Sequence, residues 1–177
     1  RINNMEIVAI VSSFVAAALV SVASRRPRMY EIASVGAGLI GLVGSLSIAY
    51  KVGTYGSYSP LSFLYIDAMS AMVMLVVAVV AFLTAVYAVP HFRQEITKKV
   101  ISLKRAQQYY VLAPLFLAAI FLTITTNHPV VAWIFLEATT LSTVFLVSFY
   151  NRASTIEAAW KYLIINAVGL LLAFFGT

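Results

Sequence analysis

The sequence predicts an all-α fold, a polytopic bundle of six transmembrane helices. Three observations predict it. Hydrophobic residues make up 62% of the 177 residues and charged residues only 10%, whereas soluble domains carry about 25% charged residues. Apolar runs recur at the length of one bilayer crossing, roughly 20 helical residues. Lysine and arginine gather in alternate loops between these runs, a pattern typical of membrane topology.

The first four helices are predicted from long uncharged runs. Each run holds between eighteen and twenty-three residues and is bracketed by ionisable side chains. Small residues recur four apart in the first run and lie close together in the second, and such stripes let helices pack closely in lipid. The predicted spans are 7–24, 32–50, 65–89 and 107–126.

Two further spans are predicted at 130–150 and 155–177, and each is interrupted by one charge. Ser154 and Glu157 have the spacing of a capping box, which favours a helix start there. Residues 90–105, between the third and fourth predicted spans, form the only long polar stretch. They are predicted to be a cytoplasmic loop. Residues 51–60 have a turn composition. With no soluble domain or linker visible, residues 1–177 are predicted to be a single membrane unit.

The basic residues predict the orientation. Of twelve Lys and Arg, nine lie after the first, third and fifth spans, and positive residues favour the cytoplasmic side. The N-terminus is therefore predicted outside. The net charge of +6 is explained by this placement rather than by a nucleic-acid partner. Without cysteine, the chain has no disulfide, thiolate nucleophile or Cys-ligated cluster.

Glu137 is the leading candidate for chemistry. It is the single ionisable side chain in "WIFLEATTLSTVFLVSFY", and by helical rise it lies about 10 Å below the outer end of its span. A carboxylate at that depth costs roughly 2.5 to 3.5 kcal/mol. Such a group takes up or releases a proton when a neighbouring cation moves, so Glu137 is predicted to belong to a proton path. The alternative is a protonated acid that joins two helices.

Lys161 is the second candidate for the proton path. It lies about 10 Å inside the cytoplasmic start of the last span. Glu157 stands four residues earlier, in the favourable Glu-to-Lys order, so a local ion pair or a lysine that extends toward the interface is the competing interpretation.

Three further candidates have simpler alternative roles. Asp67 lies where the third span begins and suits a helix cap. Asn166 is suited to a hydrogen bond between helices or to a water chain. His128, with an ordinary pKa near neutral, is either a proton-entry group or a plain turn residue. No catalytic residues, metal ligands or cofactor-binding residues are predicted in this chain, so redox chemistry is not expected in it.

The segment from Trp133 to Thr177, with "EATTL" followed by "EAAWKYL", resembles the antiporter-like proton-pumping membrane subunits of complex I-related complexes. It is most similar to the large membrane subunit of hydrogenase-4-type and formate-hydrogenlyase-type complexes. "YIDAMSAMVMLVVAVVAFLTAVYAV" is similar to the family's third helix. The resemblance implies that the chain is the N-terminal third of a larger antiporter-like fold with inverted repeats, truncated at its C-terminus.

The resemblance also implies site residues and partners. Glu137 matches the family's glutamate of the fifth helix, whose lysine partner lies beyond Thr177, and Lys161 matches a lysine in the sixth-helix motif. Expected partners are the lipid bilayer, other membrane subunits and a peripheral redox arm with Fe–S clusters and a NiFe or flavin centre. The expected location is the plasma membrane of a prokaryote.

The function predicted from these residues and this resemblance is proton or sodium-coupled translocation, driven by redox chemistry elsewhere in a respiratory or hydrogenase complex. The alternatives are a structural scaffold subunit that moves no ions and a component of a stand-alone multi-subunit cation/proton antiporter.

Overall fold

The computed structural model describes residues 5–24, 26–148 and 153–176. The all-α prediction is confirmed, and every helix in the described ranges is long and apolar enough to cross a membrane. The helices are α1 (Glu6–Ala23), α2 (Pro27–Tyr55), α3 (Ala68–Thr97), α4 (Leu103–Thr125), α5 (Pro129–Val147) and α6 (Ala153–Phe175).

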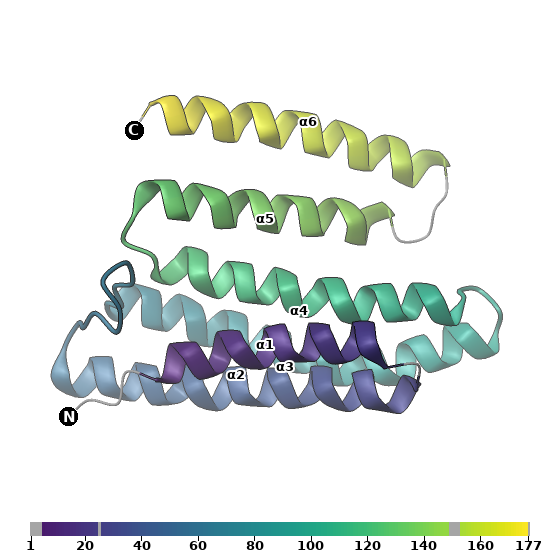
Figure 1. The fold of residues 1–177 in the computed structure, drawn as a ribbon, viewed down its shortest axis with the longest axis horizontal. Helices are drawn as coiled ribbons and strands as arrows, with labels where there is room; N and C mark the ends of the chain where they lie inside the picture. The colour runs from purple at the N-terminus through teal and green to yellow at the C-terminus, as the bar shows by residue number, and fades with distance from the viewer. Residues whose placement is uncertain (1–4, 25, 149–152, 177) are drawn as a thin grey trace.

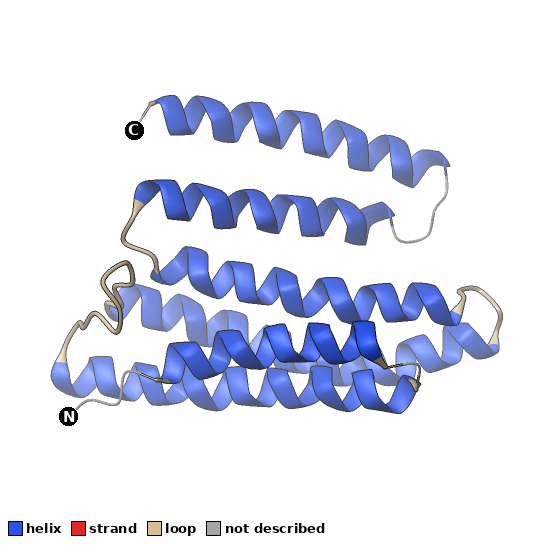
Figure 2. Cartoon of the chain, in the orientation of Figure 1, coloured by secondary structure: helices blue, strands red, loops and turns tan. Residues whose placement is uncertain are grey.

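The helices lie side by side, and successive helices run antiparallel (Figure 1). α1 packs against α2 and α4, α2 against α3, and α4 against α5, which in turn contacts α6. Figure 2 shows short loops between α3 and α4 and between α4 and α5, and a longer loop between α2 and α3. α5 and α6 are the least covered helices. In the apolar segment of each, 6% of the residues are buried, against 28–33% in α1 to α4.

The core lies among α1, α2, α3 and α4. Ile10, Phe14, Met74 and Phe121 are all almost fully buried there. The rings of Phe14 and Phe121 stack with centroids 5.6 Å apart. α1 and α2 approach closely because small residues line their contact, as the spacing of small residues in the sequence predicts. A Cβ placed on Gly44 would lie 2.7 Å from Cγ1 of Ile10.

The long loop that follows α2 is tied to the α4–α5 turn by backbone hydrogen bonds. The amide of Tyr65 donates to the carbonyl of Thr125 over 2.7 Å, and the amide of Asn127 donates to the carbonyl of Phe63 over 2.9 Å. Buried backbone groups need such partners, so this loop is held against one end of the bundle.

Two predicted boundaries are corrected. α2 is longer than the predicted 32–50, because Pro27 suits the first turn of a helix and Lys51 is held by an ion pair with Glu6. α3 continues through Pro90 to Thr97, so most of the predicted loop 90–105 is helical. Phe92, beyond that proline, is buried against Ala106 and Tyr110, and this packing compensates for the backbone hydrogen bond that a proline cannot donate.

The predicted capping box involves Ser154, whose side chain lies outside the described part of the structure. Residues 149 and 150, the last of the predicted span 130–150, also lie outside the described residues. The helix α5 ends at Val147.

Candidate ion-translocation residues

Glu137 lies near the middle of α5 and is half-buried. Several hydroxyl groups near it on α5 donate to backbone carbonyls of the same helix. They belong to Thr139, Thr140, Ser142 and Thr143. Among the residues that the structure describes, the Glu137 carboxylate has no hydrogen-bond or ion-pair partner. A carboxylate in hydrocarbon is costly, and the role of Glu137 in a proton path stays a prediction.

Lys161 on α6 forms an ion pair with Glu157, one turn earlier on the same helix. Both side chains are exposed, at 71% and 66%. No hydrogen bond or ion pair between described residues joins Lys161 to Glu137. The structure therefore shows the local pair that the four-residue spacing allows. A role of Lys161 in a proton path stays a prediction.

Asp67 is the N-cap of α3. Its Oδ1 accepts a hydrogen bond from the amide of Ser70 over 2.7 Å. This backbone hydrogen bond lowers the pKa of the Asp67 carboxyl, since it stabilises the charged form. Ser70 in turn donates its hydroxyl to the carbonyl of Ile124 over 3.2 Å, which links the start of α3 to the end of α4. The capping interpretation is thus confirmed.

The other two candidates are His128, before α5, and Asn166, in α6. His128 is exposed at the N-cap position of α5, where its side chain makes no capping hydrogen bond. Asn166 is half-buried in α6, and its side chain has no hydrogen-bond partner within the described ranges. Their proposed roles as a proton-entry group and a water-chain ligand stay predictions.

Sequence reasoning missed a buried ion pair between α2 and α3. The guanidinium Nε of Arg93 donates to both carboxylate oxygens of Glu31, over 3.1 and 3.2 Å. The side chain of Glu31 is only 7% exposed, whereas that of Arg93 is 58% exposed. The sequence does hold a signal for this pair, because Glu31 and Arg93 fall at the same end of two adjacent antiparallel spans.

Aromatic rings surround this ion pair. The rings of Tyr30 and Tyr110 lie 4.9 Å apart, and those of Phe92 and Tyr109 lie 4.5 Å apart. The hydroxyl of Tyr110 is buried and has no hydrogen-bond partner in the described chain. Burial of the Glu31 carboxylate strengthens its attraction to a cation, while Arg93 itself stays 58% exposed.

A second ion pair joins α1 to α2 at the opposite end of these helices. Nζ of Lys51 lies 2.9 Å from Oε1 of Glu6, and the two side chains are 20% and 22% exposed. The positions of Lys51 and Arg93 along the sequence do not by themselves predict either of these contacts. Both residues fasten neighbouring helices.

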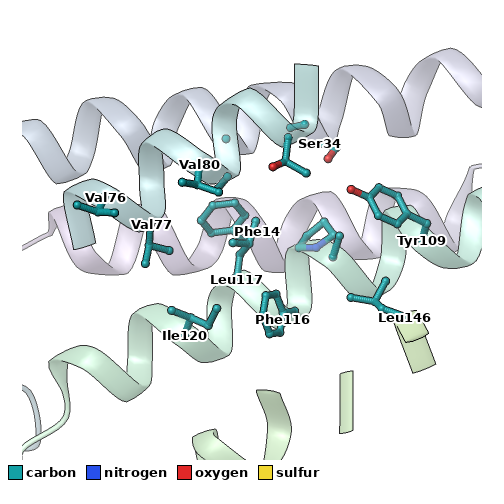
Figure 3. A pocket seen from close by; sticks show the side chains of 16 residues that line it. Phe14, Ser34, Val76, Val77, Val80, Tyr109, Phe116, Leu117, Ile120 and Leu146 are labelled. Atoms are coloured by element: carbon teal, nitrogen blue, oxygen red, sulfur yellow. The ribbon is translucent and has the colours of Figure 1, made fainter. Parts of the chain in front are cut away.

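An apolar cavity of about 450 Å³ lies mainly among α2, α3 and α4, with one lining residue each from α1 and α5. Figure 3 shows Phe14, Val77, Val80 and Leu117 around it, and polar atoms come from the labelled Ser34 and Tyr109. No group of three or more potential metal ligands occurs among the described residues.

Comparison with known proteins identifies relatives. No protein family profile matches the chain. Over 96 residues the chain is 33% identical to a protein described as "Hydrogenase-4 component F homolog" from Methylacidiphilum infernorum (isolate V4). This alignment covers 54% of the chain and 20% of that protein, so the chain spans only a small part of its relative.

The fold matches one chain in the structure of the membrane-bound sulfane sulfur reductase, described as an archaeal respiratory membrane complex. The TM-score is 0.74 at 20% sequence identity, and the match covers 94% of this chain and 34% of the other. At that identity the match shows the fold alone. Over about half of its length the chain is therefore similar to a hydrogenase-4 component F homolog, and its helices have the fold of part of a larger chain in a respiratory membrane complex.

Proposed function

We propose that this chain is part of a membrane subunit of a respiratory or hydrogenase complex, and that this subunit moves protons across the membrane. Redox chemistry in partner subunits, which carry Fe–S clusters and a NiFe or flavin centre, drives the movement. The similarity to hydrogenase-4 component F and the fold shared with a respiratory membrane complex support this assignment.

The observation that carries the proposal is Glu137. It is an ionisable group in the middle of an apolar helix, half-buried and with no partner among the described residues. An intramembrane carboxylate is costly, and its proton affinity depends strongly on whether a cation lies nearby. A lysine brought near Glu137 would lower the pKa of its carboxyl group, so that Glu137 releases a proton. Withdrawal of that lysine would raise this pKa again, and Glu137 would take up another proton.

The location follows from the same proposal. The subunit lies in the plasma membrane of a prokaryote with its N-terminus outside, because most of its basic residues then face the cytoplasm. Its partners are the other membrane subunits and a peripheral redox arm. Sodium replaces the proton in this scheme if Glu137 binds the ion as a ligand rather than as an acid.

The test is Glu137→Gln in the complete subunit, within its assembled complex in proteoliposomes. Proton uptake per redox turnover is measured with a pH-sensitive dye at several sodium concentrations. Glutamine keeps the shape of the side chain but cannot exchange a proton, so uptake falls about tenfold or more while the complex still assembles. Glu157→Gln is the matched control, since Glu157 is exposed and paired locally. Normal uptake by Glu137→Gln contradicts the proposal.

A structural scaffold subunit is the second candidate function. It is favoured by the local Lys161–Glu157 pair, which leaves Glu137 without a contact to the intramembrane lysine of this chain. A scaffold loses assembly, rather than coupling, when its charged side chains are replaced. The same assay therefore separates the two functions, because only a pump keeps redox turnover while it loses proton uptake.

A further inference from the structure

A groove of about 710 Å³ lies where α1, α4 and α5 meet at one end of the bundle. Lys104, Arg105 and Gln108 of α4 line one part of it, and Val22, Leu112 and Phe145 line the other. We call this feature the α1–α4–α5 groove. It is separate from Glu137 and from the Glu31–Arg93 pair, and the proposed ion path does not use it.

The groove changes from basic to apolar with depth. Lys104 belongs to the first turn of α4, and Leu112 lies about 12 Å further along the helix axis. α4 has 23 residues, so it spans about 34 Å and its first turn lies at the level of lipid headgroups. The basic side chains therefore lie at the interface, while Leu112 and Phe145 lie in the hydrocarbon layer.

The polar side chains of the groove differ in whether they already have hydrogen-bond partners. Gln107 donates its amide to the carbonyls of Ser21 over 2.6 Å and Ser24 over 3.2 Å, which fastens the start of α4 to the end of α1. Gln108 is exposed, and Lys104 is exposed as well. Neither has a hydrogen-bond or ion-pair partner within the described part of the chain. A polar amide about 6 Å below the first basic side chain requires an acceptor at that depth.

We propose that the α1–α4–α5 groove binds an anionic phospholipid. The lipid phosphate contacts Lys104 and Arg105, a carbonyl of its ester linkage accepts from the Gln108 amide, and an acyl chain lies against Val22 and Leu112. Basic pockets between membrane helices on the cytoplasmic side are suited to anionic headgroups. This inference depends on membrane insertion but not on proton movement.

Other occupants fit the groove less well. A free phosphate ion would satisfy the basic mouth and leave the apolar half of the groove uncovered. A purely apolar transmembrane helix would cover Phe145 and give the Gln108 amide no polar contact, and it would make no use of the charge of Lys104. The phospholipid matches both halves because its own polarity changes over the same depth.

The test is native mass spectrometry of the complete subunit, in its assembled complex, with phosphatidylglycerol or phosphatidylcholine added. Lys104→Gln/Arg105→Gln weakens retention of phosphatidylglycerol about thirtyfold, since each basic side chain near an anionic surface contributes about 1 kcal/mol and 1.4 kcal/mol is tenfold. Val22→Trp fills the apolar part of the groove and weakens binding without changing any charge. Val22 is 63% exposed, so this variant leaves the core packing unchanged.

Lys98→Gln/Lys99→Gln is the matched control, because it removes the same charge in the α3–α4 loop, outside the groove. We expect it to change retention less than about threefold, as diffuse charges are screened by salt. Equal loss in the two double variants, equal retention of phosphatidylcholine, or displacement of the lipid by glycerol phosphate would overturn the proposal. Absence of any retained lipid, with the groove covered by protein in the complex, would overturn it too.

Discussion

The guanidinium of Arg93 covers the buried carboxylate of Glu31, and this contact joins the end of α3 to the start of α2. Pro90 lies one turn before Arg93 in α3. The last turns of α3 therefore stay helical and in place through side-chain contacts, those of Arg93 and of the buried Phe92, where the backbone ladder lacks one donor.

Replacement of Arg93 alone should destabilise the protein. Arg93→Gln leaves a charged carboxylate buried among aromatic rings without its cation, and an uncompensated buried charge is strongly unfavourable. The midpoint of unfolding by SDS in mixed micelles is expected to fall. The double variant Glu31→Gln/Arg93→Gln removes both charges and should recover most of that loss. If the single and double variants have the same SDS midpoint of unfolding, the ion pair contributes no stability.

The contact between α1 and α2 should not accept a methyl group at Gly44. A Cβ there would lie 2.7 Å from Cγ1 of Ile10, whose side chain is fully buried, so Ile10 or the helix backbone would have to shift. Gly44→Ala is expected to cost about 1–3 kcal/mol of unfolding free energy, as overpacked cores do. The measurement is the same SDS titration.

Gly36→Ala is the matched control for this packing prediction, because nothing lies within 4 Å of a Cβ at Gly36. Alanine also favours the helix by as much as about 1 kcal/mol over glycine. The control variant is therefore expected to be neutral or slightly stabilised. A loss of stability at Gly36 equal to that at Gly44 would show that helix propensity, and not close approach, decides both positions.

The orientation in the membrane can be tested with cysteine, which the chain lacks. His128→Cys lies in the exposed turn before α5, and Lys98→Cys lies at the exposed end of α3. With the N-terminus outside, a membrane-impermeant maleimide labels position 128 in intact cells and position 98 only after permeabilisation. The reverse pattern would show that the basic residues do not set the orientation of this chain.

The Asp67 cap predicts a specific dependence on pH. The folded state lowers the pKa of this carboxyl because the Ser70 amide donates to its charged form. The stabilising contribution is therefore complete above the ordinary aspartate pKa, about 3.9, and is lost as the pH falls through the lower folded value. Asp67→Asn keeps a capping oxygen that does not titrate. The variant's unfolding midpoint should respond less to acid over that range, and an identical acid response in both proteins would exclude the cap as its cause.

The sequence alone predicts the number and approximate limits of the helices, because apolar length is a local property of the chain. It also places Glu137 within a span and shows that Lys161 follows Glu157 at the spacing of a local pair, which the structure contains. Prediction fails at α3 beyond Pro90, where local rules indicate a loop. Burial of Phe92 against α4 and the contact of Arg93 with Glu31 keep that segment helical.

Composition, the length of the apolar runs and the placement of basic residues determined that this protein is a bundle of membrane-crossing helices, with Glu137 inside one of them. Only the tertiary structure decided which charges on different helices meet. Glu31 and Arg93 are 62 residues apart, and their contact depends on how α2 and α3 pack rather than on any local pattern. The same holds for the α1–α4–α5 groove, whose basic and apolar halves come from helices that the chain brings together only when it folds.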